Sequence, residues 1–405
     1  MSFGCFGWLQ CCRDKNDAAQ SQGDVIAPNN VRLFSYNSLR SATEYFQPSS
    51  KIGGGGFGVV YKGVLRDGTQ VAIKCLSAES KQGTNEFLTE INTISNIRHP
   101  NLVQLIGCCV EGSHRILVYE YLENNSLASV LLGSKSKEVL LDWPRRAAIC
   151  VGTALGLAFL HEEAEPPIVH RDIKASNILL DGNFNPKIGD FGLAKLFPDN
   201  VTHLSTRVAG TIGYLAPEYA LLRQLTRKAD VYSFGVLILE IVSGKSSSKA
   251  AFGEDMMVLV EWTWKLREEE RLLELVDSEL PYYPENEVLR FIIVGLFCTQ
   301  AASNQRPTMK QVVEMLTKKV HLNQKALTEP GVYRAHPSRR SGVGALSEAS
   351  SSQARKGKQS INPNVTAAQT SYEGVSEVIP REIAAEVWKL QTAKTTYQKH
   401  EMQEQ

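Results

Sequence analysis

The chain has 405 residues, 43% of them hydrophobic, and its 44 basic and 43 acidic residues leave a formal net charge of +1. The hydrophobic content supports a full core, and the balanced charge gives no argument for nucleic-acid binding. The two strongest apolar runs, 231–242 and 291–298, are too short to span a bilayer and predict buried helices. Eight cysteines in a chain of this length do not suggest a disulfide scaffold.

Three cysteines stand among aromatic residues in the first twelve positions of the chain. Cys5, Cys11 and Cys12 are therefore candidate S-acylation sites. Ser2 occupies the position at which N-myristoylation requires glycine, so that modification is excluded. Two acyl chains would anchor the protein on a membrane without help from basic residues. The alternative is a free terminus with no role, and in either case we expect 1–33 to be a flexible segment.

A glycine-rich run follows at 53–58, with strand-like sequence on both sides of it. Backbone without β-carbons can close on nucleotide phosphates, and a valine just beyond it offers an apolar roof to adenine. A lone glycine run is more often a linker, but the stretches 59–64 and 69–74 around an Asp67-Gly68 turn place this one in a hairpin. The candidate ATP-binding residues here are Ile52, Gly53, Gly54, Gly55, Gly56, Phe57, Gly58, Val60 and Ala72.

A lysine closes the pattern Val-Ala-Ile-Lys at the end of the third strand of this region. Lys74 is placed there to bind the α and β phosphates of ATP, and it needs a carboxylate to hold it. Glu90 is our choice, because apolar residues around it recur at helical spacing, and Glu86, one turn earlier, is the alternative. Without the other motifs, either glutamate would be interpreted as a solvent-exposed charge on the surface of a helix. The prediction therefore depends on the surrounding motifs.

The sequence His-Arg-Asp-Ile-Lys-Ala-Ser-Asn at 170–177 is the expected catalytic centre. Asp172 would accept or orient the proton of the attacking hydroxyl, and Lys174 would offset charge on the transferring phosphoryl group. Asn177, together with Asp190 at the start of Asp-Phe-Gly, offers the oxygen ligands that a hard divalent cation prefers. The expected cofactors are therefore ATP and Mg²⁺, with Mn²⁺ as an alternative metal.

An arginine next to the catalytic aspartate predicts control by phosphorylation. Arg171 would be neutralised by a phosphate on the segment after Asp-Phe-Gly, which would order that segment through charge-assisted hydrogen bonds. Ser205 and Thr206 are the predicted main phosphosites because they lie in the middle of the segment. Thr211 is a further candidate, although substrate contact is its favoured role. The alternative for all three hydroxyls is turn capping.

In their order and spacing these motifs resemble those of protein kinases, and more narrowly those of plant receptor-like kinases of the Pelle/IRAK type. The resemblance covers 34–320. Further matching stretches stand at 34–43, 98–103, 117–121 and 210–218. No ectodomain or membrane span is expected ahead of the kinase region, so the chain resembles a receptor-like cytoplasmic kinase.

This resemblance implies an α+β, bilobal protein kinase fold. A small five-stranded antiparallel lobe with one main helix is expected at 46–121, and a larger helical lobe at 122–320. Lys174 and Thr211 match the serine/threonine pattern of the family rather than the tyrosine pattern. The remaining implied site residues are Tyr119 at the back of the ATP pocket, Glu120, Tyr121 and Leu122 as the hinge, Asp230 as a brace of the catalytic loop, and Arg306 paired with Glu218.

The expected activity is transfer of the γ-phosphoryl group of ATP to serine or threonine hydroxyls of protein substrates. The resemblance implies an upstream receptor kinase and a place at the cytoplasmic face of the plasma membrane, or in the cytoplasm. A scaffold of kinase fold that works by docking is the alternative, and it is disfavoured because Lys74, Asp172 and Asp190 are all present. Phosphorylation of tyrosine alongside serine and threonine is left open.

The composition of the chain changes beyond residue 320. We expect 321–405 to be a largely disordered tail, because 337–372 are rich in serine, alanine, glycine and basic residues with few large apolar side chains. A weakly periodic apolar set between 373 and 400 predicts a short helix, and a frayed tail with no role is the alternative.

Overall fold

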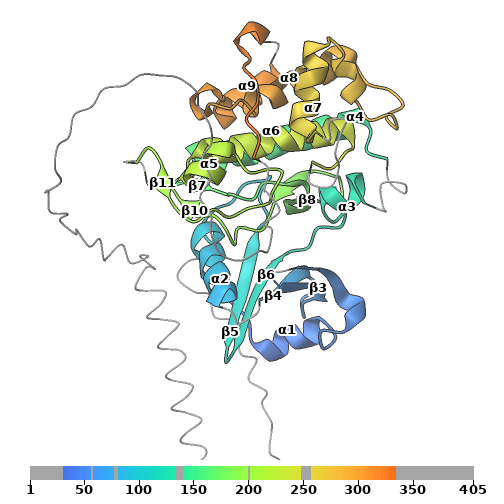
Figure 1. Ribbon diagram of the computed structural model, residues 1–405. Coiled ribbons are helices and arrows are strands. Elements are labelled where there is room, and N and C mark those ends of the chain that lie inside the picture. The colour runs from blue at the N-terminus through green and yellow to red at the C-terminus, as the bar shows by residue number, and fades with distance from the viewer. Residues whose placement is uncertain are drawn as a thin grey trace, which may run out of the picture.

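The computed structural model describes residues 31–55, 58–76, 81–133, 140–198, 201–247, 257–318 and 320–333. They form a small lobe around a β-sheet and a larger, mainly helical lobe (Figure 1). This arrangement confirms the predicted bilobal α+β class. Several predictions lie outside the described residues: Cys5, Cys11 and Cys12, the loop residues Gly56 and Phe57, and the short helix between 373 and 400.

The small lobe has a mixed sheet of six strands in the order β1-β5-β6-β4-β3-β2. Five of them form the predicted antiparallel set, and the sixth, β1, runs parallel to β5 at the edge. The strands are β1 (Arg32–Leu33), β2 (Lys51–Gly55), β3 (Gly58–Val64), β4 (Gln70–Leu76), β5 (Leu105–Glu111) and β6 (His114–Glu120). The lobe also holds α1 (Tyr36–Ala42), η1 (Pro48–Ser50) and α2 (Lys81–Ile94).

The segment before residue 46 belongs to this lobe. Val31 is buried, and Phe34 and Leu39 pack into a cluster with side chains of the sheet. Ser35 starts α1 by accepting a hydrogen bond from the backbone N–H of Ser38 at 3.2 Å. The small lobe therefore begins no later than Val31, which moves the expected boundaries at 33 and 46 towards the N-terminus.

A glycine in β5 makes room for this added layer. A Cβ at Gly107 would lie 2.5 Å from the Phe34 ring and 2.2 Å from the backbone oxygen of Arg32. Any side chain there would push β1 and its aromatic residue off the sheet. The close approach of β1 to β5 therefore depends on a residue more than seventy positions away in sequence.

The large lobe is built around two long helices, α4 (Trp143–Glu162) and α6 (Arg227–Ser243). The first begins at Asp142, whose side chain accepts from the backbone N–H of Arg145 at 3.1 Å. The other helices are α3 (Leu127–Leu131), α5 (Pro217–Leu222), α7 (Leu259–Glu268), α8 (Glu285–Cys298) and α9 (Met309–Thr317), with 3₁₀ turns η3 (Ala175–Asn177), η4 (Leu272–Leu275), η5 (Ser303–Gln305) and η6 (Gln324–Ala326).

The two apolar runs singled out in the sequence lie in α6 and α8, as predicted, and α6 is buried almost throughout. A helix that is apolar all round belongs in the middle of a core. Among the described helices, none combines the length and apolar character needed to cross a bilayer. The two helices instead pack against each other in the core of the large lobe.

Three short strand pairs lie between the lobes and carry the candidate site. They are β7 (Ile168–Val169) with β10 (Lys195–Leu196), β8 (Ile178–Leu180) with β9 (Pro186–Ile188), and β11 (Leu204–Ser205) with β12 (Gln224–Leu225). The segment that joins β7 to β8 holds the motif at 170–177, and the segment that joins β9 to β10 holds Asp-Phe-Gly at 190–192. Each motif is therefore fixed at both ends by backbone pairing.

Packed structure continues past the expected end of the large lobe. The Tyr232 hydroxyl donates to the backbone oxygen of Gly331 at 2.6 Å, and Leu327 is buried. The packed structure of the described residues therefore extends to Tyr333, past the boundary expected at 321.

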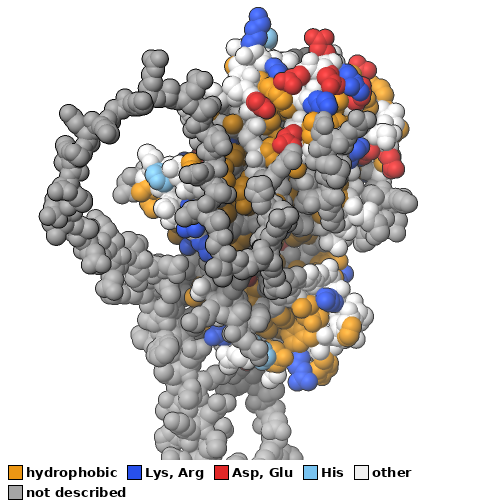
Figure 2. Space-filling model, viewed as in Figure 1, with side chains coloured by type: hydrophobic (Ala, Val, Ile, Leu, Met, Phe, Trp, Pro, Cys, Tyr) orange, Lys and Arg blue, Asp and Glu red, His pale blue; other side chains and the backbone are white. Residues whose placement is uncertain are grey.

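Charged side chains of both signs mix over the end of the large lobe that carries α7 and α8 (Figure 2). Arg271, for example, lies 2.5 Å from Glu269 and 2.6 Å from Glu274, with all three side chains exposed. Exposed pairs of this kind contribute little to stability.

Candidate active site

Lys74 lies at the centre of the small-lobe sheet, where β4 pairs it with Val60 of β3 and Leu117 of β6. Its Nζ is 2.5 Å from Glu90 Oε1 on α2 and 2.8 Å from Asp190 Oδ1. Of the two glutamates considered from the sequence, Glu90 is thus the one whose carboxylate meets the lysine. A residue of the sheet, one of α2 and one of the Asp-Phe-Gly segment converge at this point.

Burial and charge act in opposite directions on this group of three. Burial disfavours the charged form of Lys74, but the carboxylates of Glu90 and Asp190 outweigh it and raise the pKa of the lysine. Burial raises the pKa of Glu90, and Lys74 offsets that only in part. Burial also acts to raise the pKa of Asp190, but the nearby Lys74 cation outweighs it, and the net pKa is lowered. Asp190 therefore stays ionised, as a metal ligand must.

Tyr119 holds the other oxygen of the Glu90 carboxylate through a hydrogen bond from its hydroxyl. It stands in β6 opposite Ala72 of β4, so both predicted pocket residues face each other across neighbouring strands. Glu90 is fully buried, and each of its two oxygens has a partner. The resemblance placed Tyr119 at the back of the ATP pocket but gave no hint of this bond.

The hinge follows β6. Glu120 Oε1 accepts from the backbone N–H of Gln104 at 2.8 Å and from Lys187 Nζ at 3.0 Å. Tyr121 lies under a cation, with Lys62 Nζ 4.2 Å from its ring centroid, and Leu122 is buried. The hinge is thus held by Gln104 and Lys62 of the small lobe and by Lys187 of the large lobe.

The glycine-rich strand β2 lies against β3, with Gly53, Gly54 and Gly55 paired to the first residues of β3. Gly58 has a φ of +134°, and a Cβ there would lie 2.2 Å from the backbone oxygen of Cys75. Only glycine fits that position. Ile52 is partly exposed at the start of the strand, where a nucleotide base could cover it.

Three predicted side chains, Lys174, Asn177 and Thr211, lie together around Asp172. Lys174 Nζ lies 2.6 Å from Asp172 Oδ2, and the Thr211 hydroxyl donates to Asp172 Oδ1 at 2.7 Å. Lys174 Nζ also donates to Thr211 Oγ1 at 2.9 Å. Asn177 Nδ2 donates to the backbone oxygen of Asp172 at 2.8 Å and to Oδ2 at 3.1 Å. Both oxygens of the aspartate therefore have donors.

Asp230 of α6 fixes the backbone just before Asp172. Its carboxylate accepts from the backbone N–H groups of His170 at 2.7 Å and Arg171 at 2.8 Å. His161 Nε2 of α4 lies 2.9 Å from the same carboxylate. Burial acts to raise the pKa of Asp230, but these partners outweigh it and the pKa is lowered. Arg171 has a φ of +71°, a left-handed conformation that these bonds help to hold.

Two contacts that sequence reasoning missed involve histidines. His161 pairs with Asp230, but its position within an apolar helix gave no signal of that role. His170 Nε2 is 3.0 Å from the backbone oxygen of Gly189, and its ring lies 4.8 Å from that of Phe191. The first histidine of His-Arg-Asp thus ties the catalytic segment to Asp-Phe-Gly. Its place in the motif was the available signal.

Arg171 contacts the segment from Asp190 to Glu218, which we call the activation segment, through oxygen acceptors that carry no charge. It donates to the backbone oxygens of Leu193 at 2.9 Å and Arg207 at 2.8 Å, and to the Tyr219 hydroxyl at 2.5 and 3.0 Å. Ser205 is exposed in β11, and the backbone N–H of Thr206 faces the Arg223 oxygen at 3.4 Å. The structure thus brings Thr211 into the catalytic cluster and leaves Ser205 at the surface.

Glu218 and Arg306 meet at the end of the activation segment. Arg306 Nη1 and Nη2 donate to Glu218 Oε1 at 2.7 Å and Oε2 at 2.8 Å, in a bidentate pair. The arginine side chain is fully buried and the glutamate nearly so.

The oxygen atoms at the site suit a divalent cation that nucleotide phosphates also bind. Asn177 donates to Asp172 through its nitrogen, which leaves its amide oxygen as a ligand, and Asp190 has a second oxygen beyond the one that meets Lys74. Within the described part of the chain, no cluster of three His, Cys, Asp or Glu side chains could hold a metal by itself. These oxygens therefore suit Mg²⁺ when nucleotide phosphates complete its shell.

Comparisons with known proteins agree with this geometry. Residues 46–316 match the protein kinase domain family. The chain is 55% identical over 332 residues to cold-responsive protein kinase 1 of Arabidopsis thaliana, a match covering 81% of this chain and 84% of that protein. It is 51% identical over 330 residues to a probable leucine-rich repeat receptor-like serine/threonine-protein kinase of the same plant. That match covers 81% of this chain and 32% of the relative.

Proposed function

The chain belongs to the protein kinase family and is a serine/threonine protein kinase, and we propose that the side chains gathered around Asp172 carry out its phosphoryl transfer. The contact between the Thr211 hydroxyl and Asp172 Oδ1, at 2.7 Å, is the observation that supports this assignment most directly. It is the same contact that a substrate hydroxyl would make with a catalytic carboxylate.

In the proposed reaction Asp172 orients the serine or threonine hydroxyl of a protein substrate and takes its proton. The substrate oxygen forms its bond to the γ-phosphorus as the bond to the departing ADP oxygen breaks. Lys174, 2.6 Å from Asp172, offsets the negative charge on the transferring group. Its second contact, with Thr211, keeps the cation on the side where the substrate binds.

The nucleotide is assigned to the region between β2, β3 and the hinge. Lys74, held by Glu90 at 2.5 Å, would bind the α and β phosphates. Asn177 and Asp190 would hold Mg²⁺, or Mn²⁺ in its place, which neutralises the phosphates when bound. The backbone of Glu120, Tyr121 and Leu122 would meet the adenine edge beneath the glycine-rich strand.

Transfer of labelled γ-phosphate to a basic protein substrate tests these assignments. Asp190→Asn keeps the size of the side chain but removes the charge that the metal needs, and we expect it to abolish transfer. Asp67→Asn is the matched control, because Asp67 lies in an exposed turn where it accepts from the Thr69 backbone at 2.9 Å. Full activity of Asp190→Asn would refute the metal assignment, whereas equal losses in both variants would point to a general defect.

The regulation and location that we propose rest on the sequence and on the relatives. We propose activation by phosphorylation at Ser205 and Thr206 through an upstream receptor kinase, since receptor-like kinases are among the relatives. We also propose acylation of cysteines near the N-terminus, which would place the protein at the cytoplasmic face of the plasma membrane. Replacing Cys5, Cys11 and Cys12 together by serine should release the protein from membrane fractions. A variant that still fractionates with membranes would overturn the anchor.

A further inference from the structure

The chain after α9 turns back and crosses the large lobe, and we call Leu327–Tyr333 the C-terminal strap. Leu327 begins it, buried in a cluster with Ile293 and Leu296 of α8. Thr328 follows, with its backbone N–H donating to Gln300 Oε1 at 3.1 Å. The start of the strap is therefore fixed to the C-terminal end of α8.

Backbone bonds continue this attachment along the next three residues. The Ala301 N–H donates to the Glu329 oxygen at 3.3 Å, and the Gly331 N–H donates to the Thr299 oxygen at 3.3 Å. Pro330 forms an antiparallel bridge with Gln300 between them. The strap thus pairs with residues 299–301 like a short strand, which defines its register.

The strap then meets the start of α5. A Cβ at Gly331 would lie 2.7 Å from Pro217 Cγ and 3.0 Å from Ala301 Cα, so glycine alone allows this approach. The Tyr232 hydroxyl of α6 donates to the Gly331 oxygen at 2.6 Å and holds the backbone in place. Pro217 opens α5, one residue before the glutamate that pairs with Arg306.

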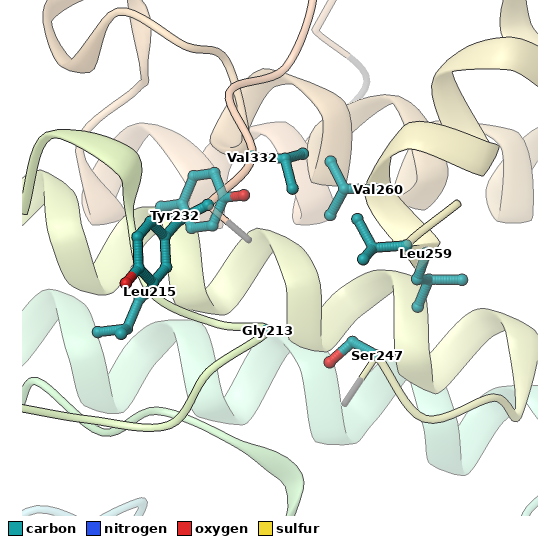
Figure 3. Close-up of a pocket in the computed structure, with 9 residues that line it drawn as sticks. Gly213, Leu215, Tyr232, Ser247, Leu259, Val260 and Val332 are labelled. Atoms are coloured by element: carbon teal, nitrogen blue, oxygen red, sulfur yellow. The ribbon is translucent and has the colours of Figure 1, made fainter. Parts of the chain in front are cut away.

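The end of the strap lies behind the loop that precedes α5. Val332 and Tyr333 line a small cavity together with Gly213 and Leu215 of that loop (Figure 3). Tyr232 of α6 and Leu259 and Val260 of α7 also line this cavity. The loop is therefore backed on this side by side chains that come from the strap.

We infer that the C-terminal strap is a positioning element for residues 210–217, and that it sets the affinity of the enzyme for its protein substrate. Thr211, which bonds Asp172 and Lys174, stands in this loop, so the inference rests on the proposed function of that cluster. Arg306 adds a second connection, because it donates to the backbone oxygens of Gln300 and Ala301, the residues that pair with the strap. Arg306 thus contacts both Glu218, next to the loop, and the residues that pair with the strap.

The nucleotide site is built from other elements. Lys74, Glu90 and the hinge come from the small lobe and its connection, and they make no part of the cavity behind the loop. A disturbance of the strap should therefore raise the KM for a peptide substrate and leave the KM for ATP unchanged. Loss of general stability would instead lower the apparent kcat, because fewer molecules are folded, and would leave both KM values unchanged.

The test uses the full chain with Gly331→Ala, which forces the strap away from Pro217, and Tyr232→Phe, which removes only the hydroxyl bond to Gly331. Glu329→Ala is the matched control, because this side chain is exposed and only its backbone takes part in the pairing. We expect Gly331→Ala to raise the peptide KM about three- to tenfold and Tyr232→Phe about two- to threefold. Glu329→Ala should match the wild type.

Hydrogen exchange of residues 210–217 gives a second measurement that needs no catalysis. We expect faster exchange in this loop for Gly331→Ala and Tyr232→Phe, with the small lobe unchanged. Unaltered exchange and an unaltered peptide KM in both variants would overturn the inference. If exchange rises while the wild type itself transfers no phosphate, the strap positions the loop but the proposed chemistry of the cluster fails.

Discussion

Arg306 allows the sharpest test of what holds the activation segment. Its side chain is fully buried, and all five N–H groups of the guanidinium are used. Two donate to Glu218 at 2.7 and 2.8 Å. The others donate to the backbone oxygens of Gln300 at 2.8 Å, Lys228 at 3.1 Å and Ala301 at 3.1 Å. Replacing Arg306 by alanine would therefore leave a nearly buried carboxylate without its guanidinium partner and would remove a hydrogen-bond donor from each of three backbone oxygens.

Removing one partner of a buried pair typically costs about 3–5 kcal/mol, because the remaining charge is left without compensation. For a domain of this size that loss corresponds to a fall in Tm of about 5–8 °C. Arg271 is the matched control. Its contacts with Glu269 and Glu274, at 2.5 and 2.6 Å, are shorter than those of Arg306, yet they are exposed. We expect Arg271→Ala to leave Tm unchanged.

Thermal unfolding of the full chain without nucleotide, followed by circular dichroism, measures both variants. The double variant Arg306→Ala with Glu218→Gln should be more stable than Arg306→Ala alone, because the buried charge is gone. If Arg306→Ala lowers Tm no more than Arg271→Ala does, burial does not decide the strength of these pairs and the reasoning is refuted.

Two further predictions concern the activation segment and pH. Replacing Ser205 and Thr206 together by alanine should lower turnover severalfold, and unchanged turnover after treatment with ATP would contradict the phosphosite assignment. Burial lowers the pKa of His99, so the unfolded chain binds more protons than the folded one below about pH 6.5. Stability should therefore fall as the pH drops below that value. Tm measured at pH 7.5 and 5.5 should fall less in His99→Gln, and an equal fall would exclude this histidine.

The parts of the site that sequence could predict are those whose chemistry requires a particular residue at a particular place in a motif. Lys74 ends a strand pattern, and helical spacing around Glu90 correctly selected it over Glu86 as the residue that meets the lysine. Thr211 was favoured for a role near the substrate, and its hydroxyl donates a hydrogen bond to Asp172. Local patterns succeed here because strand and helix periods determine which side chains face the cleft.

The parts that could not be predicted depend on pairings between distant residues with no periodic signal. The strand β1 needs the absence of a side chain at Gly107, and the strap is held mainly by backbone bonds to 299–301. Backbone bonds of this kind produce no pattern of apolar residues in the sequence. The contact between His161 and Asp230 could not be predicted for a similar reason, because a single polar residue in an apolar helix does not indicate its partner.

Arg171 shows how the structure refines the idea of control by phosphate. Four of its five N–H groups already bond Leu193, Arg207 and Tyr219, so the guanidinium holds both ends of the activation segment without any phosphate. These acceptors are neutral, and a buried cation among them gains further from a nearby negative charge. A phosphate on the exposed Ser205 would therefore strengthen an existing arrangement rather than create one. This is why we expect the alanine variants at the phosphosites to lower turnover severalfold and not to abolish it.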